Sequence, residues 1–232
     1  MKLRDKVAVI AGATGGLGRV VTRIFAENGA NLVLVGSKQE KLNQLAEDLK
    51  LPEQQYLTVV ADLSQEAAAP KILEAALQKY NQVDILLNFV GGWIGGKPVI
   101  ETTSAELSSM LEQHLMTTFF LSQTFIPHMQ TNQWGRFLIV SSPNAAKPKA
   151  NGLPYAVGKS AQEALMLTLA EELKSTGVTS NVLRVLAIDT NPEPSQKTAS
   201  WTTPEEITAA ILYLVSDDAK KINGAIIPLY GS

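Results

Sequence analysis

Short apolar runs alternate along the chain with longer segments in which apolar residues recur every three or four positions. Most of the short runs lack the apolar–polar alternation of a half-exposed strand, which is typical of parallel strands covered on both faces. They comprise residues 7–11, 32–35, 56–61, 85–90, 136–141, 181–188 and 225–229. The longer segments show helical periodicity, since residues such as Leu42, Leu45 and Leu49 fall on one helical face.

Seven such runs alternating with six helical segments predict an α/β fold of the doubly wound Rossmann type, a parallel seven-stranded sheet with helices on both faces. Residues at the expected helix ends agree with this interpretation. Thr203, Pro204 and Glu206 supply an N-cap, a first-turn proline and an N3 glutamate for the last helix. Because no internal repeat or linker interrupts the sequence, we expect residues 1–232 to form a single domain, with the segment 191–202 as a mobile loop.

Composition excludes several classes of protein. The 232 residues are 45% hydrophobic and 18% charged, as in an ordinary globular chain. The absence of cysteine excludes disulfides, thiolate metal sites and a cysteine nucleophile, and with two histidines we expect no metal site. A net charge of −2 provides no positive field for nucleic acid. Since no apolar stretch approaches the roughly 18 residues of a membrane span, we expect a cytoplasmic protein without a membrane partner.

A glycine-rich segment directly follows the first predicted strand and opens the first predicted helix. Its glycines permit a tight turn, and the helix N-terminus presents backbone N–H groups and a favourable dipole to an anion such as a pyrophosphate. The alternative is a glycine-rich turn that binds nothing; its position in an α/β chain favours dinucleotide binding. The residues expected to contact the dinucleotide here are Gly12, Thr14, Gly15, Gly16, Leu17 and Gly18.

A tyrosine, a lysine and a serine form the candidate catalytic group. Tyr155 and Lys159 are four residues apart, which places a phenol and an ammonium on one helical face. Ser142 ends the fifth predicted strand, thirteen residues before Tyr155. Hydride delivery to a carbonyl carbon requires a proton for the nascent alkoxide. A tyrosine can supply that proton where a neighbouring cation lowers its pKa. The alternative is an exposed Tyr–Lys pair on a surface helix.

The Gly-x-x-x-Gly-x-Gly spacing and this catalytic group resemble the short-chain dehydrogenase/reductase family, over almost the whole chain. The resemblance implies an NAD(P)-dependent oxidoreductase that transfers hydride between the nicotinamide and a carbonyl or alcohol of a small organic substrate. It implies Tyr155 as general acid/base, Ser142 as the donor that holds the carbonyl oxygen, and Lys159 as the partner of the nicotinamide ribose.

The resemblance extends to weaker segments that follow other strands. Asp62 matches the residue that contacts the adenine amino group, although an N-cap of the following helix is a competing role. Thr190 matches the contact to the nicotinamide carboxamide. The further cofactor-binding residues that the resemblance implies are Leu63, Asn88, Val90, Gly91 and Ile188.

Two departures from the family pattern open alternatives. His114 aligns with an asparagine that holds a water in the family's proton relay; a neutral imidazole can also hold a water, or His114 is a helix residue without a catalytic role. The segment 91–96 and the absence of Pro-Gly after the sixth strand resemble dihydropteridine reductases, which reduce a planar quinonoid ring. Trp93 and Trp201 would stack on such a substrate, or would simply cover the open end of the sheet. Ser142 and Lys38 argue against that branch.

Cofactor choice depends on the end of the second predicted strand. Family members that prefer NAD carry an acidic residue there, whereas this chain has Gly36 followed by Ser37 and Lys38. A hydroxyl and an ammonium suit a 2′-phosphate, so the sequence favours NADP over NAD. Two observations oppose this choice: Ser37 and Lys38 can simply begin a helix, and Gly15 stands where NADP-preferring relatives often have a basic residue.

The sequence also predicts self-association. Residues 107–129 carry more apolar side chains than a single stripe facing the sheet requires. Family members commonly pair this helix and the next one across a two-fold axis, so we expect a homodimer or homotetramer. A non-catalytic, cofactor-binding sensor is the remaining alternative function, which the intact catalytic group disfavours.

Overall fold

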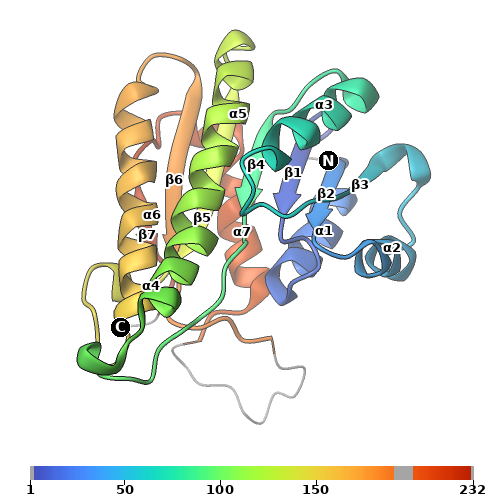
Figure 1. Cartoon of the computed structure of the whole chain (residues 1–232). Helices are drawn as coiled ribbons and strands as arrows, with labels where there is room; N and C mark the ends of the chain where they lie inside the picture. Colours follow the sequence, from blue (N-terminus) through green and yellow to red (C-terminus); the bar gives the residue numbers. More distant parts are fainter. Residues whose placement is uncertain (1–2, 191–200, 231–232) are drawn as a thin grey trace.

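A parallel sheet forms the centre of the computed structural model, which describes residues 3–190 and 201–230 (Figure 1). Within these residues, seven strands follow the order β3-β2-β1-β4-β5-β6-β7, and each neighbouring pair is parallel. The strands are β1 (Val7–Ala11), β2 (Asn31–Gly36), β3 (Tyr56–Val60), β4 (Ile85–Asn88), β5 (Gly135–Ser141), β6 (Val178–Arg184) and β7 (Ile226–Pro228). The predicted fold class is confirmed.

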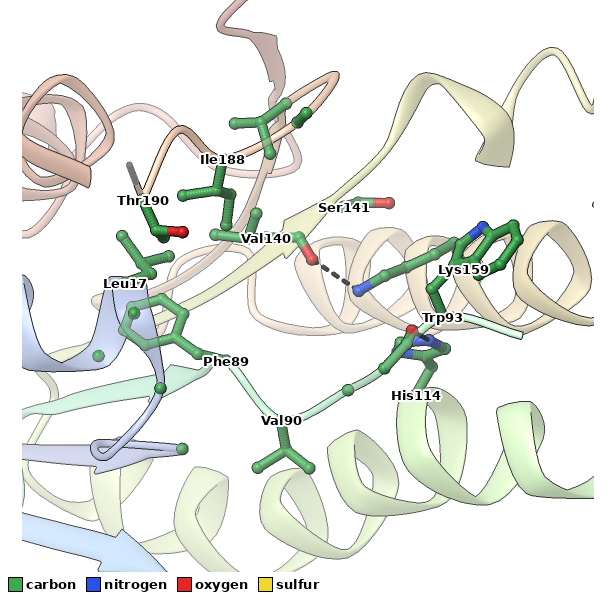
Figure 2. Close-up of a pocket in the computed structure, with 18 of the residues that line it drawn as sticks. Leu17, Phe89, Val90, Trp93, His114, Val140, Ser141, Lys159, Ile188 and Thr190 are labelled. Atoms are coloured by element: carbon green, nitrogen blue, oxygen red, sulfur yellow. Dashed lines mark hydrogen bonds between the residues drawn. The ribbon is translucent and has the colours of Figure 1, made fainter. Parts of the chain in front are cut away.

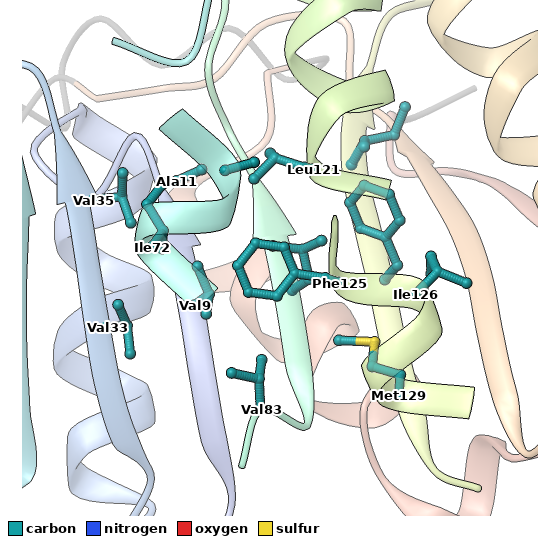
Figure 3. Close-up of a cluster of buried hydrophobic side chains, with 14 of the residues drawn as sticks. Val9, Ala11, Val33, Val35, Ile72, Val83, Leu121, Phe125, Ile126 and Met129 are labelled. Atoms are coloured by element: carbon teal, nitrogen blue, oxygen red, sulfur yellow. The ribbon is translucent and has the colours of Figure 1, made fainter. Parts of the chain in front are cut away.

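Helices cover both faces of the sheet. On one face lie α1 (Gly16–Glu27), α2 (Gln39–Asp48) and α7 (Pro204–Leu214), and on the other α3 (Ala68–Tyr80), α5 (Thr117–Thr131) and α6 (Leu153–Glu172). Alternate residues of one strand enter different cores: Val9 packs with Ile72 and Phe125 (Figure 3), whereas Ile10 packs with Phe25. Every helix within the described residues is too short or too polar to span a bilayer.

The last helix begins as its sequence predicts. Thr203 Oγ1 accepts from the Glu206 N–H at 3.2 Å, and the Glu206 carboxylate accepts from the Thr203 N–H at 2.8 Å. This reciprocal pair satisfies backbone donors that a helix start otherwise leaves free.

Most predicted strands are confirmed to within one or two residues. The sixth strand is the exception, since it runs over Val178–Arg184 and not over the predicted 181–188. Its first half is polar, and the apolar pattern therefore missed it. Ser180 and Asn181 are nevertheless buried, because Ser180 Oγ donates to the Met166 carbonyl at 2.7 Å and Asn181 Nδ2 donates to the Ile222 carbonyl at 2.8 Å. Buried polar groups are tolerated when they are hydrogen-bonded in this way.

The fourth helical segment is interrupted in its middle. Helix α4 (Ser104–Leu111) continues through a π-helical turn, Glu112–Met116, into α5. The sequence predicts a regular helix here, because its apolar periodicity runs through the interruption. A π-turn widens the helix locally and is frequent at functional sites. It places His114 inside the molecule, next to the cleft described below.

Candidate active site

A cleft with two lobes lies at the carboxyl ends of the strands. The lobes have volumes of about 360 and 310 Å³ and share residues at the ends of β1 and β4: Gly12, Gly15, Phe89, Val90 and Gly91. The first lobe contains Tyr155 and Lys159, and the second contains Ser37 and Asp62. An elongated ligand bound at Gly12 and Gly15 would therefore extend toward both groups of residues.

The glycine segment shapes the junction of the two lobes. Gly12 has a φ of +82°, a conformation that side-chain-bearing residues rarely adopt. Helix α1 starts immediately afterwards, with Gly15 as its N-cap. A Cβ at Gly18 would overlap the Gly12 carbonyl oxygen, so this close approach of helix and turn requires glycine. The N-terminal N–H groups of a helix have no intrahelical partners, and those of Gly16, Leu17 and Gly18 border the cleft.

The second lobe contains the residues expected near the adenosine. Thr14, Ser37, Asp62 and Leu63 line it. Lys38 is exposed beside this lobe as the N-cap of α2, and among the described residues it makes no side-chain cap hydrogen bond. Ser37 therefore precedes the N-cap and does not occupy it.

Asp62 does not act as the N-cap of the following helix. Its carboxylate accepts from the Ser64 hydroxyl at 2.7 Å and from the Ser64 N–H at 3.1 Å. These two hydrogen bonds lower the pKa of Asp62 and keep its carboxylate ionised. Helix α3 starts only at Ala68, with Ala67 as N-cap. Instead of capping α3, Asp62 closes a local turn with Ser64. This turn leaves the Asp62 side chain exposed on the second lobe.

Tyr155 lines the first lobe and is hydrogen-bonded to Ser142, which is buried and lies outside the described residues that line the lobe. Tyr155 lies in the first turn of α6, and Ser142 follows directly after β5. Burial raises the pKa of the Tyr155 hydroxyl, and a hydrogen bond with Ser142 partly offsets this effect. A half-buried, protonated phenol beside a second hydroxyl is an arrangement that can donate a proton to a bound oxygen.

Lys159 is buried one helical turn after Tyr155. Its Nζ donates to the Val140 carbonyl at 2.8 Å (Figure 2) and to Gln162 Oε1 at 3.0 Å. Burial lowers the pKa of Lys159 to about 7, although the nearby carboxylate of Glu163 opposes this shift. Tyr155 and Lys159 thus line the first lobe from one face of α6, and Ser142, thirteen residues before Tyr155, is bonded to that tyrosine.

His114 is held against the loop that follows β4. Its Nε2 lies 3.1 Å from the Gly92 carbonyl oxygen, and its ring meets that of Tyr155 edge-on at a centroid distance of 5.5 Å. Nδ1 is buried and has no hydrogen-bond partner among the described residues. Burial and the charge of Lys159 lower the pKa of His114 to about 3, so the ring is neutral at physiological pH. The relay role of this ring stays a prediction.

The remaining predicted residues divide into those that line the cleft and those that do not. Val90, Gly91, Trp93, Ile188 and Thr190 line the first lobe. Among the described residues, Asn88 lines neither lobe, because it is buried. Its Oδ1 accepts from the Val90 N–H at 3.0 Å, so Asn88 shapes the loop after β4. Trp201 is 43% exposed and also lies outside the described lining residues. Residues 191–200, which belong to the predicted mobile loop, fall outside the part of the chain that is described.

Sequence reasoning missed two buried polar residues, one bonded to Lys159 and the other bonded to the first. Gln162 is fully buried and bonded to Lys159, and Thr118 is fully buried and bonded to Gln162. The available signal was an uncharged polar residue three positions after the lysine, on the same helical face.

Comparison with known proteins agrees with the geometry. A family model described as short chain dehydrogenase matches residues 6–200. A 1,6-dihydroxycyclohexa-2,4-diene-1-carboxylate dehydrogenase of Pseudomonas putida is 30% identical, over 99% of this chain and 93% of that protein. The 7alpha-hydroxysteroid dehydrogenase of Escherichia coli K12 is 28% identical, over 100% and 95%. The crystal structure of a levodione reductase superposes with a TM-score of 0.90 at 25% identity, over 99% of this chain and 97% of that one.

Proposed function

The chain belongs to the short-chain dehydrogenase family, and from this premise we propose that it transfers hydride between a nicotinamide dinucleotide and a carbonyl or alcohol of a small organic substrate. Enzymes of this family are oxidoreductases that use NAD or NADP. The observation that carries the proposal is the position of Tyr155 and Lys159 at one end of a cleft whose middle is the glycine turn, with the buried Ser142 hydroxyl hydrogen-bonded to Tyr155 behind them.

The cleft suits such a dinucleotide. The N–H groups at the start of α1 favour a pyrophosphate, and Gly16 keeps this region open, since a Cβ there would lie 2.6 Å from Thr190 Cγ2. Asp62 and Leu63 would hold the adenine end, and Ile188 and Thr190 the nicotinamide end. The bound nicotinamide supplies or accepts the hydride.

Each member of the catalytic group has a defined task in carbonyl reduction. The Ser142 hydroxyl donates a hydrogen bond to the carbonyl oxygen and holds it beside Tyr155. The Tyr155 hydroxyl donates its proton to that oxygen as negative charge develops. The Lys159 ammonium stabilises the resulting tyrosinate and bonds the ribose of the cofactor. In alcohol oxidation the same groups act in reverse order.

Replacing Tyr155 by Phe removes the proton donor and little else. We expect Tyr155→Phe to lower kcat at least tenfold while the cofactor dissociation constant stays nearly unchanged, because the glycine turn provides most of the binding. Lys159→Ala should lower kcat and also raise the cofactor dissociation constant. Steady-state kinetics and fluorescence titration with cofactor measure them. A Tyr155→Phe enzyme that retains more than about a tenth of kcat would contradict the assigned mechanism.

A second candidate is reduction of a quinonoid pteridine. Trp93 favours it, because this side chain lines the first lobe and is 62% exposed, as a stacking surface for a planar ring would be. A spectrophotometric screen of ketones, aldehydes, quinones and quinonoid dihydropterin with both reduced cofactors separates the candidates. Turnover of the dihydropterin alone supports the second candidate. Cofactor binding without any turnover supports a sensor.

We further propose NADP as the preferred cofactor. Position 36 carries no carboxylate to repel a 2′-phosphate. The exposed Ser37 hydroxyl lines the lobe, and the exposed Lys38 ammonium follows it at the start of α2. Both groups are suitable donors to a phosphate dianion.

Dissociation constants for NADPH and NADH at fixed ionic strength test this preference. NADPH should bind more tightly to the parent protein. Lys38→Ala should weaken NADPH binding about fivefold or more, since it removes a charge-assisted hydrogen bond, and should leave NADH binding unchanged. Lys41→Ala, which removes an exposed charge from the same helix, is the control. Tighter binding of NADH, or an unchanged NADPH affinity in Lys38→Ala, would overturn the proposed preference.

Assembly into a dimer or tetramer through α5 and α6 completes the proposal. A largely apolar groove between these helices is lined by Phe119, Ile126, Leu165 and Leu169, among others. We expect light scattering at micromolar concentration to give a multiple of the 25.0 kDa chain mass. A mass equal to one chain would show that the groove is not a subunit interface under those conditions.

A further inference from the structure

Lys159 is bonded to a buried network of side chains that joins three elements. Gln162 Oε1 accepts from Lys159 at 3.0 Å, and Gln162 Nε2 donates to Thr118 Oγ1 at 2.8 Å. The Thr118 hydroxyl donates to the His114 carbonyl at 2.7 Å and accepts from Asn88 Nδ2 at 3.0 Å. Gln162 and Thr118 are completely buried, so water does not compete for these bonds.

The direction of every bond in this network is fixed. A hydroxyl has one proton, and Thr118 gives it to the His114 carbonyl, which can only accept. Thr118 must therefore accept from the amide nitrogen of Gln162. The amide oxygen of Gln162 consequently faces Lys159, and the opposite orientation of the amide would place two donors against each other.

The network determines which way Lys159 points. The ammonium has three N–H groups, and the Val140 carbonyl and Gln162 Oε1 take two of them. We propose that Gln162, itself held by Thr118, is a positioning residue that fixes the Lys159 side chain so that its third N–H faces the cleft. This inference rests on the proposed function, because it assigns to that third N–H the bond to the cofactor ribose.

Among the charged and titratable groups around Lys159, Glu163 favours the charged form of the ammonium through its field, which raises the pKa of Lys159. The Glu163 carboxylate, one position further along α6, is bound by Arg184 of β6, whose Nε lies 2.8 Å from Glu163 Oε1. From the π-turn, His114 faces Lys159 as a neutral ring, because burial lowers the pKa of His114 to about 3. Tyr155 lies on the same helix as Lys159 and is protonated, since burial raises its pKa. Gln162 is thus the side-chain acceptor that, together with the Val140 backbone carbonyl, bonds the ammonium without adding charge.

Replacing Gln162 should shift the titration of Lys159 in a predictable direction. An acceptor bonded to an ammonium favours its charged form, so Gln162→Leu should lower the pKa of Lys159. The alkaline limb of the kcat profile, and the pH at which NADPH affinity falls, should then move down by roughly half to one unit. Gln162→Glu places a carboxylate beside the ammonium and should move both upward. A residue that merely supports folding would shift neither value.

Two further variants separate positioning from loss of stability. Thr118→Val frees the Gln162 amide without touching Lys159 and should cause a smaller downward shift. Ser180→Ala removes another fully buried hydroxyl, which bonds the α6 backbone at Met166, and should leave both pH midpoints unchanged. If Gln162→Leu does not fold, Gln162→Glu and Thr118→Val still provide shifts of opposite sign.

The NADPH titration distinguishes failure of this inference from failure of the proposed function. NADPH-binding midpoints that move as expected in a protein that neither reduces a carbonyl compound nor oxidises an alcohol uphold the role of Gln162 and refute the function. Turnover with midpoints that coincide in the parent protein and all Gln162 and Thr118 variants upholds the function and overturns the role of Gln162.

Discussion

The parallel pairing of β1 with both β2 and β4 is the constraint on which the site depends. Because parallel strands run in the same direction, all their carboxyl ends lie at one edge of the sheet, and each strand is joined to the next by a crossover connection. After β1 the chain enters α1 on one face, whereas after β4 it proceeds to α4 and α5 on the other. The two connections diverge, and a crevice opens between them. The residues shared by both lobes of the cleft, Gly12 and Gly15 after β1 and Phe89, Val90 and Gly91 after β4, stand at this divergence.

Close packing at this point leaves little freedom in the sequence. Gly18 lies against the Gly12 carbonyl, which lets the first turn of α1 start directly at the strand end. The helix dipole and the free N–H groups are thereby directed into the crevice. The loop after β4 is held from the other side, because Asn88 bonds the Val90 N–H and His114 bonds the Gly92 carbonyl.

The polar interior supplies the second half of the site. Removing an ammonium from water is costly unless its donors are bonded, and Lys159 meets this requirement through Val140 and Gln162. Through Thr118 and Asn88 the same bonds reach α5 and β4, so the position of the lysine is tied to the sheet and not to α6 alone. A satisfied buried network of this kind favours one arrangement of the surrounding elements.

Much of this architecture follows from local sequence signals, and the rest depends on contacts between distant residues. The apolar run 7–11 and the glycines after it predicted β1, the turn and the start of α1, since strand burial and helix starts are encoded locally. The start of β6 was missed because Ser180 and Asn181 are polar and their burial depends on partners elsewhere in the chain. The π-turn at His114 was missed for a related reason: apolar periodicity continues through it. The partners of Gln162 appear only once α5 and α6 are packed together.

We infer that one nicotinamide dinucleotide spans both lobes of the cleft. A crystal structure of the protein with bound NADPH tests it most directly. We expect the pyrophosphate at the N–H groups of Gly16–Gly18, the adenosine beside Ser37 and Asp62, and the nicotinamide ribose bonded to Lys159 Nζ. A dinucleotide bound elsewhere, or one whose nicotinamide lies away from Tyr155 and Lys159, would contradict this mode of cofactor binding.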